Sequence, residues 1–199
     1  MFETIRQVID GMDLNSISSE RKVHLDQLRS YIQGKRDAKL PVQLNFICTH
    51  NSRRSQFAQL WAQVAADYYG IEANCFSGGV EITAFNPRAV ASLKSLGFKI
   101  DSPCGENPKY EVHWKSGKSL KMFSNFFDDP TCPSEGFAAI MTCSHADENC
   151  PFVAGCEQRI PLRYEDPKRF DDSPLESTFY SYRSYEIATE LFYVFSGIQ

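Results

Sequence analysis

The stretch LNFICTHNSRRSQFAQLWAQ, residues 44–63, decides the fold of this chain. It begins as an apolar run that ends at Cys48, continues as a short polar loop, and then takes up the spacing of an amphipathic helix. A strand that passes through a short loop into a helix directs its loop amides and the positive end of the helix dipole toward one point. Cysteines held at such points are commonly thiolates at neutral pH, so Cys48 is a candidate nucleophile beside an anion-binding loop.

The loop has the spacing Cys-x5-Arg-Ser, and none of the other six cysteines has an arginine at that distance. Arg54 can hold a tetrahedral oxyanion with its planar fork, and Ser55 can donate its hydroxyl to the thiolate. The predicted oxyanion-binding loop consists of Thr49, His50, Asn51, Ser52, Arg53 and Ser55. Asn51 tolerates a left-handed backbone. Arg53 would add a second cation or face solvent, and His50 would tune the thiolate or have no role. A buried structural cysteine beside two solvated arginines is the alternative to this site.

Outward from this loop, the pattern alternates between strands and helices. We expect strands at 42–48, 71–79, 136–143 and 159–167, of which the last is short and runs into a loop. We expect helices at 53–69, 86–97 and 175–195, and a β-hairpin at 109–124. Alternation at these lengths predicts a parallel sheet with right-handed crossovers. The expected fold is therefore an α/β three-layer sandwich with a central, mainly parallel sheet and an inserted hairpin.

Residues 1–40 are expected to form a helical N-terminal extension in front of a domain at 41–199. Ser18 or Ser19 offers an N-cap for its main helix, and Pro41 closes the segment. Its apolar residues fall roughly on one stripe: Val23, Leu25, Leu28, Tyr31 and Ile32. We expect this extension to cover the core or a partner and to contribute no chemistry.

The composition argues against several classes of protein. With 199 residues, a hydrophobic content of 42% and a formal net charge of −4, the chain can bury a substantial core and lacks the basic character of a general nucleic-acid-binding protein. The N-terminal residues do not resemble a signal peptide, and no apolar run approaches the length of a membrane span. Seven irregularly spaced cysteines are a poor disulfide framework. We therefore expect reduced thiols and a cytoplasmic location.

A second stretch with cysteines, MTCSHADENCP at 141–151, follows another apolar strand. It carries Cys143 at the strand end and Cys150 after a polar segment, 144–149. A disulfide needs Cα atoms roughly 4.4–6.8 Å apart, so this segment would have to change shape for the two thiols to join. The alternative is structural zinc, for which this region offers Cys132, Cys143, His145, Cys150 and Cys156 without a Cys-x2-Cys pair.

The loop at 48–55, its flanking strand and helix, and the segment SGGVEITAFNPRAVASLKSLG at 77–97 resemble the low-molecular-weight protein tyrosine phosphatase superfamily. Within that superfamily, the string Cys-Ser-x-Ala-Asp-x-Asn-Cys-Pro is similar to that of the thioredoxin-coupled arsenate reductases. The resemblance spans about residues 42–196. It implies that the domain at 41–199 is catalytic and reduces arsenate to arsenite.

The resemblance also implies a mechanism and a partner. Cys48 would attack arsenate, Cys143 would resolve the adduct, and Cys150 would pass the disulfide on to thioredoxin, so no bound cofactor is expected. Some family members bind potassium through an acid on the first helix. The corresponding residue here is Gln59, and we predict no metal site.

Two other functions stay open. One is a phosphomonoesterase of the protein tyrosine phosphatase type, which would use only Cys48, Arg54 and Asp166 and form a cysteinyl-phosphate intermediate. The other is a non-catalytic sensor of oxyanion or redox state.

The general acid is expected in YEDPKRF, residues 164–170. In the superfamily the acid is an aspartate before a proline, after the last core strand, and Asp166 matches that position. The proline restricts the preceding residue to extended geometry, which would aim the carboxyl group inward. Asp129 also precedes a proline but lies beside the hairpin, so we prefer Asp166. Lys168 and Arg169 follow it as a basic rim that suits a small inorganic anion.

Overall fold

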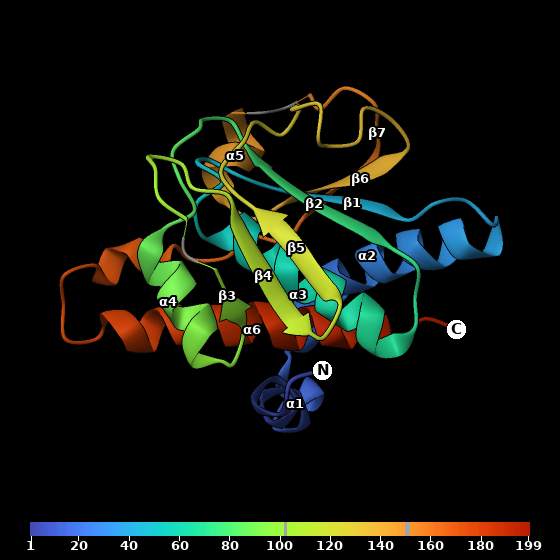
Figure 1. Ribbon diagram of the computed structural model, residues 1–199. Coiled ribbons are helices and arrows are strands. Elements are labelled where there is room, and N and C mark those ends of the chain that lie inside the picture. Colours follow the sequence, from blue (N-terminus) through green and yellow to red (C-terminus); the bar gives the residue numbers. More distant parts are fainter. Residues whose placement is uncertain (102, 150–151) are drawn as a thin grey trace.

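A computed structural model describes residues 1–101, 103–149 and 152–199. Its centre is a four-stranded parallel sheet in the order β2-β1-β6-β7 (Figure 1). These strands are β1 (Gln43–Cys48), β2 (Asn74–Gly79), β6 (Phe137–Met141) and β7 (Cys156–Pro161). All of β1 after Gln43 is buried, as expected for a central parallel strand that is covered on both faces. Because β1 and β6 are parallel neighbours, the chain segments that follow them emerge at the same edge of the sheet.

Helices α3 (Arg54–Tyr69) and α6 (Glu176–Ser196) are layered below the sheet in Figure 1. Trp61 of α3 joins the two helices. It donates its indole N–H to Ser184 at 2.9 Å and packs edge-to-face on Phe192, with ring centroids 6.3 Å apart. α4 (Pro87–Ser95) packs on α6. Its N-cap is Asn86, whose side chain accepts a hydrogen bond from Arg88 N.

The other face of the sheet carries a smaller apolar cluster. Ile47 and Met141 point into it, as do Cys48 and Cys143, and Ala146 of α5 (Ser144–Asn149) covers it. Helices on both faces confirm the predicted three-layer sandwich. Of the described helices, none is long and apolar enough to cross a membrane.

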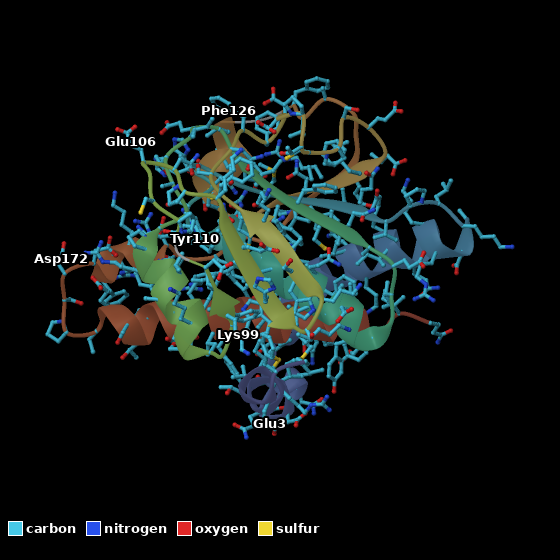
Figure 2. All side chains as sticks on the ribbon, in the orientation of Figure 1. Glu3, Lys99, Glu106, Tyr110, Phe126 and Asp172 are labelled. Atoms are coloured by element: carbon cyan, nitrogen blue, oxygen red, sulfur yellow. The ribbon has the colours of Figure 1, made fainter. Side chains whose placement is uncertain are left out.

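The inserted hairpin is confirmed and belongs to a second, antiparallel sheet. Its strands are β3 (Lys99–Ile100), β4 (Tyr110–Lys115) and β5 (Lys118–Met122). Tyr110, labelled in Figure 2, lies at the start of β4 and packs edge-to-face on Phe85, with ring centroids 5.7 Å apart. Trp114 donates its indole N–H to Asp67 of α3 at 3.1 Å, which attaches this sheet to the helix layer.

The N-terminal segment consists of α1 (Glu3–Asp10), the 3-10 turn η1 (Leu14–Ser16) and α2 (Ser19–Asp37). Ser18 is the N-cap of α2, since its side chain accepts the Arg21 N–H at 3.1 Å. Four members of the predicted stripe are buried: Leu25, Leu28, Tyr31 and Ile32. The prediction was wrong for Val23, which is 62% exposed. Val23 lies two residues before Leu25, about 200° around the helix, and therefore on its outer face.

Several elements differ from those predicted: β3 was not expected, and β2 begins at Asn74, three residues after its predicted start. The polar segment 144–149, for which no helix was predicted, forms α5, and β7 begins at Cys156, three residues before the predicted start. After β7 the chain continues through the 3-10 turn η2 (Pro167–Phe170) into α6. The predicted acid loop therefore lies between the last core strand and the last helix.

Candidate active site

Residues 49–53 form the loop between β1 and α3, and their carbonyl oxygens face donors from neighbouring segments. Glu81 N donates to Thr49 O at 2.9 Å, and Ser124 Oγ donates to His50 O at 2.8 Å. Among the described residues, the amide N–H groups of this loop have no protein acceptor. They are therefore available to bind an anion at the N-terminus of α3.

Two glycines of β2 allow the loop to lie against the sheet. A Cβ atom on Gly79 would lie 2.8 Å from Asn51 N and 2.9 Å from the carbonyl carbon of His50. A Cβ atom on Gly78 would lie 2.2 Å from Phe127 Cα. The close approach of three backbone segments explains the tandem glycines at the end of this strand.

The thiol of Cys48 lies inside this loop and is only 3% exposed. Its Sγ is 3.1 Å from Ser55 Oγ, and the side-chain amide of Asn51 donates to the same oxygen at 2.9 Å. Because Ser55 Oγ accepts from Asn51, its own proton is free to point at the sulfur. In this arrangement Ser55 can donate its hydroxyl to the sulfur of Cys48.

Asn51 has a left-handed φ of +45°, which its residue type tolerates, and its side chain braces the loop. Its Oδ1 accepts from Gln56 Nε2 at 3.0 Å and from Asn125 N at 3.1 Å. Gln56 also donates to Asn51 O and to Phe123 O. The buried amides thereby tie the loop to α3 and to the segment that follows β5.

Arg54 points toward the predicted acid. Its Nη2 lies 2.7 Å from Asp166 Oδ2, and its Nη1 donates to Tyr164 O at 3.1 Å. Arg54 Nε is buried and has no hydrogen-bond partner among the described residues. A planar guanidinium with an unpaired inner N–H beside unpaired loop amides is suited to a tetrahedral oxyanion. Asp166 Oδ1 accepts from Lys168 N at 3.1 Å, which fixes the carboxylate.

The second candidate acid, Asp129, has a different role. Its Oδ1 accepts from Thr131 Oγ1 at 2.7 Å and from Thr131 N at 2.9 Å. These hydrogen bonds, the side-chain one first, hold the pKa of Asp129 below its ordinary value. Asp129 therefore stabilises a turn, whereas Asp166 contacts Arg54.

Arg53 and His50 flank the loop. Arg53 Nε donates to Tyr180 OH at 2.8 Å, and its Nη2 lies 3.6 Å from Asp171. Its side chain is 11% exposed, so it does not face solvent, and it binds the loop to Tyr180 of α6. His50 lies at the rim with its Nε2 3.1 Å from Glu81 Oε2.

Cys143 follows β6 and lies next to the Cys48 loop. It is 1% exposed, and its Sγ is 3.5 Å from Thr49 Oγ1. Ala146 N, in the first turn of α5, donates to the same sulfur at 3.4 Å. The structure therefore brings a second buried thiol to the loop, in contact with the residue after Cys48. The predicted relay residue, Cys150, lies outside the described residues.

The remaining described cysteines have no comparable surroundings. Burial raises the pKa of Cys75, of Cys156 and of Cys132, the last to about 11. Cys104 is exposed. Within the described part of the chain, one set of possible metal-binding side chains converges within 4.8 Å, and it consists of Asp101, Glu111 and His113 on the antiparallel sheet. The described members of the predicted zinc set do not form such a group.

Several contacts of the site were not found from the sequence. Thr49 was assigned to the loop, but its contact with His145 joins residues 96 positions apart. The link from Arg53 to Tyr180 spans 127 positions. Local sequence patterns cannot predict contacts between residues that are so far apart in the chain. The tandem glycines at 78–79 were the one signal of close backbone approach.

Comparisons with known proteins agree with this geometry. Residues 43–112 match the family described as low molecular weight phosphotyrosine protein phosphatase. An arsenate reductase of Halalkalibacterium halodurans is 26% identical over 131 residues, which cover 66% of this chain and 78% of the relative.

Two solved structures share the fold. A low molecular weight phosphotyrosine phosphatase from Vibrio cholerae superposes with a TM-score of 0.52 at 12% identity, covering 76% of this chain and 93% of that chain. An arsenate reductase in its oxidised state superposes with a TM-score of 0.51 at 17% identity, covering 79% of this chain and 98% of that chain. The predicted resemblance and the predicted fold are both confirmed.

Proposed function

We propose that this chain, which has the fold of the low molecular weight phosphotyrosine phosphatases and resembles arsenate reductases in sequence, reduces arsenate to arsenite. The observation that carries this proposal is the second buried thiol, Cys143, held against the loop of Cys48 through Thr49. Hydrolysis of a phosphate ester needs one nucleophile, an anion clamp and an acid. A reduction also needs a second thiol within reach.

Arsenate binds to the amides of 49–53 and to Arg54. In this complex the Arg54 guanidinium holds the oxyanion, and Asp166 serves as the general acid. The Cys48 thiolate attacks arsenic, the bond to one oxygen breaks, and Asp166 protonates that oxygen so that it leaves as water. The product of this step is a covalent adduct between Cys48 Sγ and arsenic(V).

The Cys143 thiolate then attacks the sulfur of Cys48. A disulfide forms, the sulfur–arsenic bond breaks, and its electron pair stays on arsenic, which leaves as arsenite. Cys150 attacks Cys143, frees Cys48 and forms a second disulfide. A dithiol protein of the thioredoxin class reduces that disulfide, and no bound cofactor takes part.

Arsenate-dependent oxidation of NADPH, coupled through thioredoxin and thioredoxin reductase, tests this function. Cys48→Ser, Cys143→Ser and Cys150→Ser are each expected to abolish turnover, because each removes one thiol of the relay. Cys104→Ser is the matched control, since Cys104 is exposed and outside the site. Its turnover should equal that of the wild-type protein.

Hydrolysis of para-nitrophenyl phosphate is measured in parallel, because a tetrahedral phosphate fits the same loop. Hydrolysis that needs Cys48 but not Cys143 is expected as a side activity. Hydrolysis with no arsenate-linked oxidation would contradict the proposal and would identify a phosphatase. Equal arsenate turnover by Cys143→Ser would contradict the thiol relay.

A further inference from the structure

A chain of hydrogen bonds connects the buried thiol of Cys143 to the surface. The Thr49 hydroxyl lies 3.5 Å from Cys143 Sγ and 3.2 Å from His145 Nδ1. Cys143 and Thr49 are buried, whereas His145 is exposed. A thiol without access to water needs a route for its proton before it can react as a thiolate. These two contacts provide one.

We propose that His145 is a positioning residue that receives, through Thr49, the proton lost by Cys143. This inference rests on the proposed function, in which Cys143 attacks Cys48. The proton of Cys143 passes to Thr49 Oγ1, while the hydroxyl proton of Thr49 passes to Nδ1 of a neutral His145. The step forms a thiolate and an imidazolium, and Thr49 keeps one proton throughout.

The surroundings of Cys143 favour the charge that this transfer creates. After the transfer, the thiolate accepts hydrogen bonds from Thr49 Oγ1 and from Ala146 N, which lies 3.4 Å away. Hydrogen bonds to the charged form stabilise it. The imidazolium donates to the hydroxyl oxygen of Thr49 on the other side, so both new charges have partners.

Other charged groups near His145 are already paired or exposed. Asp147 on the same helix contacts Arg159 of β7 and Arg163, and Glu148 is exposed. On the side of the sheet, the titratable groups in the same apolar cluster are Cys48, at the end of β1, and Cys143, which follows β6. Histidine is the side chain that ordinarily changes charge between about pH 5 and 8. Because His145 is exposed, its imidazole can pass this proton on to solvent.

The first test needs no arsenate. The ultraviolet absorbance of the Cys143 thiolate is followed against pH, as the difference between each protein and the same protein with Cys143→Ser. We expect the thiolate to form at higher pH in His145→Gln and in Thr49→Val than in the wild-type protein. Thr49→Ser keeps the hydroxyl and should restore the wild-type profile. Glu148→Gln is the matched control on the same helix and should leave the profile unchanged.

The second test measures the single-turnover rate at which the Cys48–Cys143 disulfide forms after reduced protein is mixed with arsenate. His145→Ala should slow this step about 10- to 100-fold at neutral pH, and free imidazole in the buffer should restore much of the rate. A merely structural histidine would not show imidazole rescue.

The outcomes separate the two proposals. If the pH profile of the Cys143 thiolate is unchanged in His145→Gln, the proposed proton transfer to His145 is wrong, whatever the arsenate assay gives. A rate loss that is equal at every pH and is not rescued by imidazole also overturns it. If the wild-type protein forms no Cys48–Cys143 disulfide after it is mixed with arsenate, the proposed function is wrong. The pH profiles of the Cys143 thiolate then still decide whether His145 accepts its proton.

Discussion

Gly79 sets how closely the end of β2 approaches the loop that carries Cys48. The space that its Cβ would need is filled by the amide of Asn51, the carbonyl carbon of His50 and the carbonyl oxygen of Glu81, the last at 2.6 Å. These are backbone atoms, which cannot turn aside as a flexible side chain can. The orientation of the loop amides therefore depends on a hydrogen atom at position 79.

Gly79→Ala is expected to lower the free energy of unfolding by about 1–3 kcal/mol, as overpacking in a tight region does. It should also weaken binding of phosphate, because the loop must move away from β2. Urea denaturation and phosphate titration measure the two effects. Gly34→Ala is the control: Gly34 lies inside α2 with no atom within 4 Å of its Cβ position. This change should stabilise the protein by about 0.5–1 kcal/mol.

The sequence predicts the contacts within the Cys48 loop but not those between residues that are far apart in the chain. The loop from Cys48 to Ser55 is a local motif, so the backbone of Asn51 and the contact between Ser55 and Cys48 could be expected from spacing alone. The partner of Arg53 could not, because Tyr180 belongs to α6 and only tertiary packing brings it to the loop.

Among the elements, α5 is short and polar and depends on pairing with its neighbours. Asp147 contacts Arg159 of β7 and Arg163, and its side chain is 10% exposed. Burial alone would raise the pKa of Asp147, but the hydrogen bonds and charges of Arg163 and Arg159 outweigh it, and the pKa lies below its ordinary value. The two arginines therefore stabilise the charged aspartate and, with it, the helix whose Ala146 N–H donates to Cys143 Sγ.

Asp147→Asn is expected to lower the free energy of unfolding at neutral pH by about 1–3 kcal/mol. Since the folded-state pKa of Asp147 is depressed, its contribution is complete above the unfolded value, about 3.9. It declines as the pH falls through the folded value. Urea denaturation at several pH values measures this. The difference between wild type and Asp147→Asn should stay constant from neutral pH down to about pH 5 and narrow only in stronger acid. A difference that already vanishes near pH 6 would contradict this account.

This dependence also explains why α5 was not predicted. Six residues without an apolar stripe carry no helical periodicity, and the helix exists because β7 and the segment after it supply arginines. The longer elements were predictable because α3 and α6 bury long apolar faces and β1 is a continuous apolar run. The position of Cys143 beside the loop followed from the parallel pairing of two predicted strands.

Across the whole molecule, the N-terminal segment is part of the core that supports the site. Arg21 of α2 pairs with Glu190 of α6 through two hydrogen bonds, at 2.7 and 2.8 Å. Its guanidinium carbon also lies 4.8 Å from the centre of the Tyr164 ring. The carbonyl of Tyr164 in turn accepts from Arg54. One arginine of the extension thus contacts the residue that orients the anion clamp.

Arg21→Ala is expected to lower the free energy of unfolding by about 3–5 kcal/mol, because it leaves the buried carboxylate of Glu190 without a cation. Arg6→Ala removes an exposed arginine of α1 and should change stability by about 0.5 kcal/mol or less. Urea denaturation compares the two. Arg21→Met combined with Glu190→Leu should recover much of the loss, since an apolar pair removes the unpaired charge together with the salt bridge. If Arg21→Ala costs no more than Arg6→Ala, α2 is only loosely attached, and the support that it gives to Tyr164 and Arg54 is not energetically significant. A large loss in Arg21→Ala with recovery in the double variant would instead mean that the pairing of the extension with α6 contributes substantially to the stability of the fold that holds Tyr164 and Arg54.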